Sequence, residues 1–461
     1  MTRTTATAKR GILRGLVLCL SFTPAGSAGR QDLSAKTKGP CDRSPLVITR
    51  ATLWTTEGQI SNAEVLLSGG RVTAIGKSGK VARPAGAEVI DAAGDMLLPG
   101  LIDAHAHLVF PGSAPKEFLD DPLRKEFLIT GKQLLRSGVT SARIHLWDLV
   151  DGPAFRRETE DDCFPAPRLQ IGGPGFLGGA PELNGKNVWG IKDAEDIRRK
   201  IERVKSVGAQ WIAVHDLEKF TPGQLGDLVA EARRAGLRVM AAGETPVSIQ
   251  RALEIGADSI EYLDRTSTEA YSTELIARMK ERGRSLFLVP PIGYFHRYVE
   301  FRRNERLLDN PIQIEFMPDA LSTHLLNNLR AERTRSSQPS SIERSFPTFP
   351  NKFRQLYDAG LNVAVGSDCG SPANFQTNSI WWELETWRKL GVAPAEAIRG
   401  ATTRGAALLQ TPDIGNLKAG MRADFVIYKG NITSGSFEFQ RVRYVGKSGV
   451  LFVRDGRWVG P

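Results

Sequence analysis

Short apolar runs alternate with amphipathic stretches through the central part of this chain. Residues 210–214 and 237–241 are rich in apolar side chains, as expected of strands that are buried on both faces. Residues 222–235, between these two runs, carry apolar side chains at helical spacing. A longer apolar stretch, residues 97–108, predicts another buried strand. Buried strands that alternate with helices predict parallel βα units.

Length and composition agree with a globular enzyme that has a large core. The chain has 461 residues, of which 41% are hydrophobic and 24% are charged, and this composition does not indicate disorder. A barrel of eight βα units takes about 250–300 residues. The chain is therefore long enough for such a barrel and a second, smaller domain.

Two histidines stand at a spacing of two at the end of the 97–108 stretch. Side chains at positions i and i+2 of a strand point to the same face, so His105 and His107 can bind one ion together. A pair of core histidines that make ordinary hydrogen bonds is the alternative. The sequence around them favours the metal site.

Residues 99–107 closely resemble the first barrel strand of the amidohydrolase superfamily, because a Pro-Gly pair, an aspartate and both histidines fall in register with that motif. The resemblance is to its imidazolonepropionase/prolidase-like branch, and it extends over most of the chain. Further segments resemble the family's N-terminal β-domain, its second, sixth and eighth barrel strands, and the helix and return strand that lead back to the β-domain: residues 59–76, 138–141, 258–261, 359–368, 394–398 and 415–426.

The resemblance implies an α/β fold: a (β/α)8 TIM-like barrel with a small β-sandwich domain formed from both chain ends. Four segments are expected along the chain. They are a signal peptide at 1–28, the N-terminal part of the β-domain at 46–98, the hydrolase-like barrel at 99–412, and the C-terminal return to the β-domain at 413–461.

The resemblance also implies ligands for one metal ion. In the binuclear members of the superfamily, one ion is held by the two histidines of strand one and an aspartate of strand eight. The corresponding residues of this chain are His105, His107 and Asp368, and all three are present.

The ligands of a second ion are missing. Relatives hold that ion with histidines of strands five and six and with a carboxylated lysine of strand four. Here Ala213 stands at the position of the lysine, and Tyr262 at that of the strand-six histidine. The strand-five histidine corresponds to Ala242 or, in a shifted alignment, to Glu244. All of these departures affect one ion and its bridge.

One interpretation is a hydrolase with a single divalent ion, expected to be zinc. Its fourth ligand would be water, His215 or Glu244. His215 lies two residues beyond Ala213 and points to the same side of its strand. A rim histidine that bonds to the backbone explains His215 as well.

A single ion is enough for hydrolysis, because it activates water and polarises a carbonyl. The resemblance implies that Asp368 is the general base and passes the proton to the leaving group. The expected substrate is a small molecule with an amide, a cyclic amide or a related C–N bond. Tyr262 could donate a hydrogen bond to the substrate oxygen or could simply be a packing residue.

A second interpretation is a barrel without metal. Such a protein would bind a ligand, or would catalyse an isomerase or lyase step with Asp368, His105 and Glu244 as acid–base groups. Retention of both histidines and the aspartate favours the hydrolase.

The N-terminus has the three-part pattern of a secretory signal peptide. Lys9, Arg10 and Arg14 precede an apolar run at 15–22, and small residues follow up to Ala28, where we expect cleavage. A basic N-terminus without a targeting role is the alternative. The run is too short for a stable membrane span, so the mature protein is expected to be secreted or periplasmic. Removal of the segment lowers the formal net charge from +10 to +6, because its four charged residues are all basic.

The remaining positive charge does not predict nucleic-acid binding. Residues 296–306 concentrate it, but Glu300 and Glu305 are interspersed, which is typical of a solvated helix face. Residues 334–350, rich in Ser, Pro and Arg, predict a long loop over the active-site face. The sequence does not determine the oligomeric state.

The three cysteines outside the expected signal peptide are Cys41, Cys163 and Cys369. Cys41 and Cys163 could pair in an oxidising compartment, although sequence alone does not place them close together. Cys369 follows Asp368 and is expected to be a small buried residue, with a nucleophile as the alternative.

Overall fold

The structure is a computed structural model that describes residues 41, 44–112, 121–145, 151–180, 188–262, 264–335 and 339–461. The expected signal peptide lies outside these residues. No helix in the described ranges is long and apolar enough to cross a membrane.

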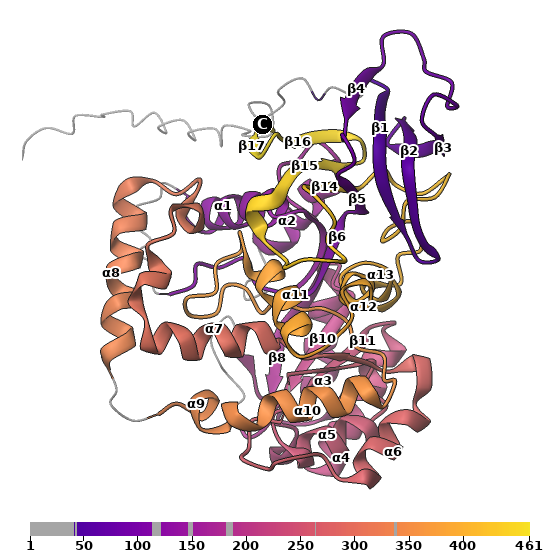
Figure 1. Ribbon diagram of the computed structural model, residues 1–461. Coiled ribbons are helices and arrows are strands. Elements are labelled where there is room, and N and C mark those ends of the chain that lie inside the picture. The colour runs from indigo at the N-terminus through magenta and orange to yellow at the C-terminus, as the bar shows by residue number, and fades with distance from the viewer. Residues whose placement is uncertain are drawn as a thin grey trace, which may run out of the picture. The chain divides into compact units, whose positions relative to one another are not determined.

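A sheet of parallel strands curves into the predicted barrel (Figure 1). Its hydrogen-bonded order is β13-β12-β11-β10-β8-β7-β6, with the short β9 beside β8. The strands are β6 (Leu101–Ala106), β7 (Val139–His145), β8 (Arg168–Leu177), β9 (Val188–Trp189), β10 (Trp211–His215), β11 (Arg238–Ala242), β12 (Ser259–Glu261) and β13 (Phe287–Val289).

Residues 362–369 take the place of the eighth strand. The Leu288 backbone N–H donates to Asn362, and Ala364 donates back to Leu288, so this segment joins β13. On its other edge, the Ala104 N–H donates to the Val365 carbonyl and joins β6. The barrel order is thereby closed, as the resemblance implied.

Helices follow the strands and cover the barrel (Figure 1). The predicted helix at 222–235 is confirmed as α4 (Pro222–Arg234); a capping box between Thr221 and Gln224 and a proline in the first turn start it. The others of this layer are α1 (Pro122–Arg136), α2 (Asp151–Thr159), α3 (Ala194–Ser206), α5 (Pro246–Glu254) and α6 (Thr273–Glu281).

The connection between β13 and residue 362 is helical, so the prediction of a long loop at 334–350 is wrong for the described residues. Ser340 and Glu343 form a capping box that starts a short helix, and Phe349 begins another. One of the serines of this segment, Ser340, is therefore a helix cap and does not mark a loop. The helices are α7 (Ile292–Arg303), α8 (Asp319–Arg335), α9 (Ser341–Ser345) and α10 (Phe349–Asp358).

Within residues 296–306, Glu300 and residues 303–306 are exposed, as expected of a solvated face, but the other side of α7 is buried. Arg297 is buried, with its guanidinium 4.9 Å from the Trp382 ring centroid, and it donates to the Leu307 carbonyl. Val299 and Phe301 are buried on the same helix. The Trp382 ring and the backbone carbonyl stabilise the buried Arg297 guanidinium, although the sequence pattern predicts an exposed side chain.

Both chain ends contribute to a second sheet, as predicted. Its order is β17-β16-β15-β14-β5-β1-β2-β3, with β4 paired to β1. The antiparallel pair of β5 and β14 joins the early and late strands (Figure 1). The strands are β1 (Leu46–Thr55), β2 (Gly58–Ser68), β3 (Arg71–Lys77), β4 (Glu88–Asp91), β5 (Met96–Pro99), β14 (Phe425–Tyr428), β15 (Val442–Lys447), β16 (Val450–Arg454) and β17 (Arg457–Trp458); α11 (Ser379–Lys389), α12 (Pro394–Gly400) and α13 (Thr403–Leu409) precede β14.

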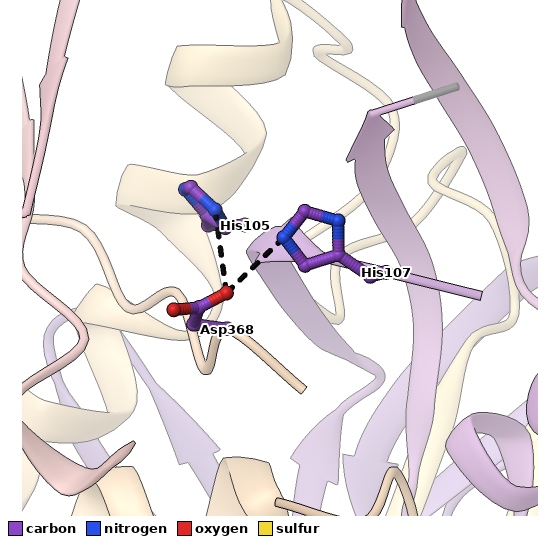
Figure 2. A group of neighbouring side chains, drawn as sticks. All are labelled: His105, His107 and Asp368. Carbon is purple, nitrogen blue, oxygen red and sulfur yellow. Dashed lines mark ion pairs between the residues drawn. The ribbon is translucent and has the colours of Figure 1, made fainter. Parts of the chain in front are cut away.

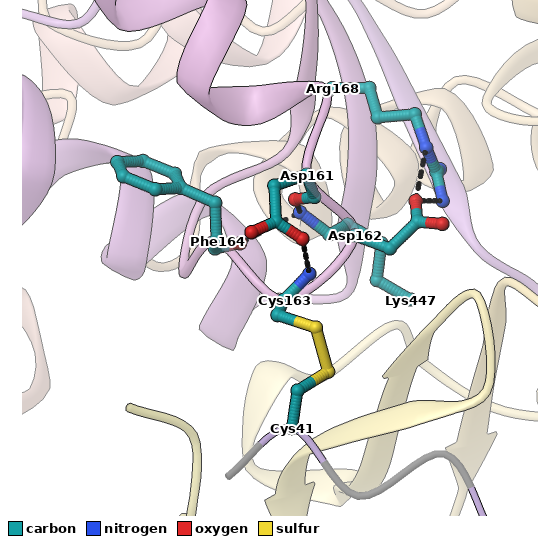
Figure 3. Close-up of a disulfide and its surroundings, with 7 residues drawn as sticks. All are labelled: Cys41, Asp161, Asp162, Cys163, Phe164, Arg168 and Lys447. Atoms are coloured by element: carbon teal, nitrogen blue, oxygen red, sulfur yellow. Dashed lines mark hydrogen bonds and ion pairs between the residues drawn. A yellow bond between two sulfur atoms is a disulfide. The ribbon is translucent and has the colours of Figure 1, made fainter. Parts of the chain in front are cut away.

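Cys41 and Cys163 form a disulfide, the pairing that the sequence left open (Figure 3). The Cys163 loop is also held by Lys447 of β15, whose Nζ donates 2.7 Å hydrogen bonds to the carbonyls of Phe164 and Ala166. The third cysteine, Cys369, is buried, and burial raises the pKa of its thiol. A neutral buried thiol agrees with the structural interpretation of this residue.

Candidate metal centre

The closed barrel brings His105 and Asp368 together although 263 positions separate them in the sequence. The Asp368 N–H donates to the His105 carbonyl at 2.8 Å, and the His107 N–H donates to the Cys369 carbonyl at 3.0 Å. Gly366 permits this close approach, because a Cβ at that position would lie 2.7 Å from the Cβ of His105. Backbone hydrogen bonds between the two segments therefore hold the three side chains of the site close together.

His105, His107 and Asp368 form one buried cluster whose possible ligand atoms all lie within 4.8 Å of one another (Figure 2). The Nε2 of His107 is 3.1 Å, and that of His105 3.7 Å, from the same Oδ1 of Asp368. Two imidazoles and a carboxylate are a donor set that suits zinc and similar divalent ions. The residues thus fit the ion that the sequence predicted.

Asp368 is held as a carboxylate. Burial raises its pKa, but the hydrogen bond from His107 and the charge of His105 hold the pKa below its ordinary value. The Ser371 hydroxyl donates a further 3.0 Å hydrogen bond to Oδ1. The backbone of Asp368 has a left-handed φ of +50°, which is uncommon for a residue other than glycine. The carboxylate at this end of the barrel is ionised and fixed.

Glu261 of β12 lies directly behind the cluster and was not predicted. Its Oε2 is 2.8 Å from Nδ1 of His105, and its Oε1 accepts a 2.7 Å hydrogen bond from Arg143 of β7. Burial raises the pKa of Glu261, but Arg143 and His105 hold it below its ordinary value. An acid within an apolar strand, at a spacing of two from Ser259, was the available sequence signal.

Asp103 holds the neighbouring backbone. One of its oxygens accepts from the N–H groups of His105 and Ser367, and the other accepts from the Ser367 hydroxyl at 2.5 Å. Burial raises the pKa of Asp103 to about 6. This aspartate of the strand-one motif links the first strand to the segment that closes the barrel.

His215 does not join the ligand cluster found among the described residues. It ends β10, and its ring lies so close to Gly175 that a Cβ there would be 3.0 Å from the ring. Burial, together with the charge of His105, lowers the pKa of His215 to about 4. The residue is a neutral imidazole near the site, outside the three-residue ligand set.

Glu244 is likewise outside that cluster, and forms an ion pair with Arg265. The Arg265 guanidinium lies 5.2 Å from the ring centroid of Tyr262. In turn, the Tyr262 ring meets the His105 ring edge-on, with centroids 5.2 Å apart. Burial and the charge of Asp368 raise the pKa of Tyr262 well above its ordinary value, so its hydroxyl is a hydrogen-bond donor beside the cluster.

Ala213 and Ala242, at the positions of the relatives' lysine and histidine, are buried and offer no ligand atoms. Ala213 packs inside the barrel against Trp211 and Met240. In the part of the chain that the structure describes, His105, His107 and Asp368 form the one group of three or more such residues close enough to hold an ion.

Comparison with known proteins agrees with this fold and site. The amidohydrolase family matches residues 96–458. The chain belongs to this family, and with it to the hydrolases that act on carbon–nitrogen bonds.

Among curated proteins, the chain is similar to imidazolonepropionases. It is 25% identical to that of Streptomyces griseus over 386 residues, which are 80% of this chain and 86% of the relative. It is 26% identical to that of Anaeromyxobacter dehalogenans, over 84% of this chain and 87% of the relative.

Among solved structures, a Xaa-Pro dipeptidase with bound methionine has a TM-score of 0.69 at 21% identity, covering 89% of this chain and all of that one. A putative prolidase from Bifidobacterium longum has a TM-score of 0.68 at 22% identity, covering 90% and 96%. At sequence identities this low, the structural likeness shows only that these proteins share the fold of this chain. The curated relatives support the imidazolonepropionase/prolidase-like branch that the sequence resembles.

Proposed function

We propose that this protein hydrolyses an amide or cyclic amide with one divalent ion, expected to be zinc, held by His105, His107 and Asp368. The observation that carries the proposal is the buried cluster of these three side chains. The alanines at the positions of the bridging lysine and the strand-five histidine support a single ion.

In this proposal the ion supplies Lewis acidity, which polarises a substrate carbonyl and makes water a better nucleophile at neutral pH. Asp368 is ionised because its pKa is lowered, so it can accept a proton from the attacking water. It then delivers that proton to the nitrogen that leaves. Ser371 donates to Oδ1 and keeps the carboxylate in one orientation.

Tyr262 is the candidate donor to the substrate oxygen. Its neutral hydroxyl and its contact with the His105 ring support this role. Solvent is the favoured fourth ligand, because His215 and Glu244 lie outside the cluster.

The substrate is expected to be a small molecule. The curated relatives are named imidazolonepropionases, and a structural neighbour is named a Xaa-Pro dipeptidase. Cyclic amides and amides of small acids are therefore the first compounds to screen.

We also propose that the mature protein is secreted or periplasmic. The N-terminal pattern supports this location, as does a disulfide, since disulfides persist in oxidising compartments.

The first experiment is elemental analysis of the purified mature chain, with His105→Ala beside it. About one divalent ion per chain, lost in His105→Ala, supports the proposal and justifies the amide screen. Absence of metal from the wild type, even after incubation with zinc or manganese, would contradict it. The ion-free alternative, ligand binding or an acid–base step by Asp368, His105 and Glu244, would then be tested by ligand binding.

A further inference from the structure

Arg143 and Glu261 form a buried ion pair across the interior of the barrel. In the strand order, β8, β10 and β11 separate β7 from β12, so the arginine reaches across to the opposite wall. The side chains of Arg143 and Glu261 are only 1% and 2% exposed. A buried charge pair of this kind costs desolvation energy, and its position beside the ligand cluster is what suggests a role.

The guanidinium of Arg143 is fixed from three sides. Nε donates to the Ala104 carbonyl at 2.6 Å, Nη1 to the Ser259 hydroxyl at 2.9 Å, and Nη2 to Glu261 at 2.7 Å. The guanidinium carbon also lies 4.6 Å from the Trp211 ring centroid. Arg143 therefore holds one oxygen of Glu261 in a single place.

The other oxygen of Glu261 decides which nitrogen of His105 carries the proton. A carboxylate oxygen 2.8 Å from Nδ1 requires a hydrogen on that nitrogen. When the ring is neutral, as a metal ligand must be, its lone pair is then on Nε2, the nitrogen that points to Asp368. A carboxylate that fixes the tautomer and orientation of a metal-binding histidine also makes the ring a stronger ligand.

We infer that Glu261 is a positioning residue of the metal centre and that Arg143 keeps it in place. The inference rests on the proposed single-metal function. Asp103 complements the pair, because it accepts from the His105 backbone N–H while Glu261 fixes the ring.

The test measures the zinc dissociation constant of the full mature chain, by competition with a chromophoric chelator. Glu261→Gln removes the charge and keeps the size of the side chain. We expect its dissociation constant for zinc to rise about 10- to 100-fold. The visible absorption band of the Co²⁺-substituted protein should also change, because that band reports ligand geometry.

Glu64→Gln is the matched control. Glu64 is also fully buried and pairs with Arg83 at 2.6 Å, but it belongs to the second sheet. It should leave zinc affinity and the cobalt band unchanged.

Glu261→Gln leaves Arg143 buried without its partner charge, and this variant could fail to fold for that reason. A double variant keeps the test possible in that case. Glu261→Gln with Arg143→Met removes both charges and should show the same loss of zinc affinity. If the wild type binds one ion and a folded Glu261 variant binds it as tightly, the inference is wrong and the proposed function stands. If the wild type takes up no ion at all, the proposed function fails, and this inference fails with it.

Discussion

The ammonium group of Lys352 lies 3.0 Å from a carboxylate oxygen of Asp264, and both side chains are fully buried. Lys352 also donates 2.9 Å hydrogen bonds to the carbonyls of Asp264 and Thr266. The loop that contains these acceptors follows β12 and includes Tyr262 and Arg265. This ion pair therefore ties α10 to the loop that places the tyrosine beside the cluster.

Replacement of Lys352 by methionine should destabilise the protein strongly. It leaves Asp264 buried without its partner, and loss of one member of a buried pair costs about 3–5 kcal/mol. Urea unfolding measures the change. The control is Lys219→Met, because Lys219 pairs with Asp216 at 2.6 Å but its side chain is 57% exposed; we expect at most about 1 kcal/mol there. If both substitutions lowered the unfolding free energy by the same small amount, burial of the Lys352–Asp264 pair would not contribute to stability.

Much of the barrel could be predicted because its strands are short, apolar and regularly alternated with helices. The runs at 210–214 and 237–241 became β10 and β11 with a shift of one residue. The insertion after β13 could not be predicted in this way. Helix α9 starts at the Ser340 cap, and α10 has a proline in its first turn, so local composition indicated a loop. Buried Arg297 packs on a tryptophan that is distant in sequence, so its charge indicated a surface position.

The candidate site also has residues that local sequence patterns predict and residues that they do not. The pair His105 and His107 was predictable from its local spacing, and Asp368 from the resemblance of its own segment to the family's eighth strand; the closed barrel brings the three together. Glu261 and Arg143 were not predicted, since their contact depends on strands that face each other across the barrel. A spacing rule along one strand carries no information about the opposite wall.

Gly366→Ala should disturb both the fold and the metal centre. A Cβ at this position would collide with Val289 and lie 2.7 Å from the Cβ of His105. We expect a loss of roughly 1–3 kcal/mol in unfolding free energy and weaker zinc binding, measured by urea unfolding and chelator competition. Gly226→Ala in α4 is the control: a Cβ there meets nothing within 4 Å. It should stabilise the helix by about 0.5–1 kcal/mol. A stable Gly366→Ala variant with normal zinc affinity would show that the strands can separate without cost.

Lys447 should make stability depend on pH above neutrality. Burial, and next the charge of Arg168, lower its pKa to about 7 from an ordinary value of 10.5. Between these values the unfolded chain binds a proton that the folded chain does not, so the unfolding free energy rises with pH. Below about pH 7, both states carry the charge and the full cost of burying it remains.

The pH effect is measured as the difference in unfolding free energy between the wild type and Lys447→Met, by urea titration from pH 6.5 to 9.5. This difference should change in favour of the wild type as pH rises, by roughly 3 kcal/mol between pH 6.5 and 9.5. Exposed Lys80→Met provides the baseline. A difference independent of pH would mean that the carbonyls of Asp161, Phe164 and Ala166, which accept from Nζ, keep Lys447 charged throughout.

Asp368→Asn should separate catalysis from folding. Asparagine keeps the shape but cannot accept the proton, so turnover of any amide that the wild type hydrolyses should fall about 10²- to 10⁴-fold. The unfolding transition should change far less. Ser371→Ala, which removes the 3.0 Å hydrogen bond to Oδ1, should cost less than tenfold in turnover, because one hydrogen bond contributes about 1 kcal/mol. Full activity of Asp368→Asn would rule out this residue as the general base.

His215→Ala distinguishes the two roles that the sequence left open for this histidine. The structure places it outside the cluster of three ligands, and its low pKa comes from burial. We therefore expect its zinc dissociation constant to stay within about threefold of the wild-type value, a difference of less than 1 kcal/mol. His107→Ala, measured beside it by the same chelator competition, should lose zinc. A loss of zinc affinity in His215→Ala as large as that in His107→Ala would make His215 the fourth ligand and would require the end of β10 to move toward Asp368 when the ion binds.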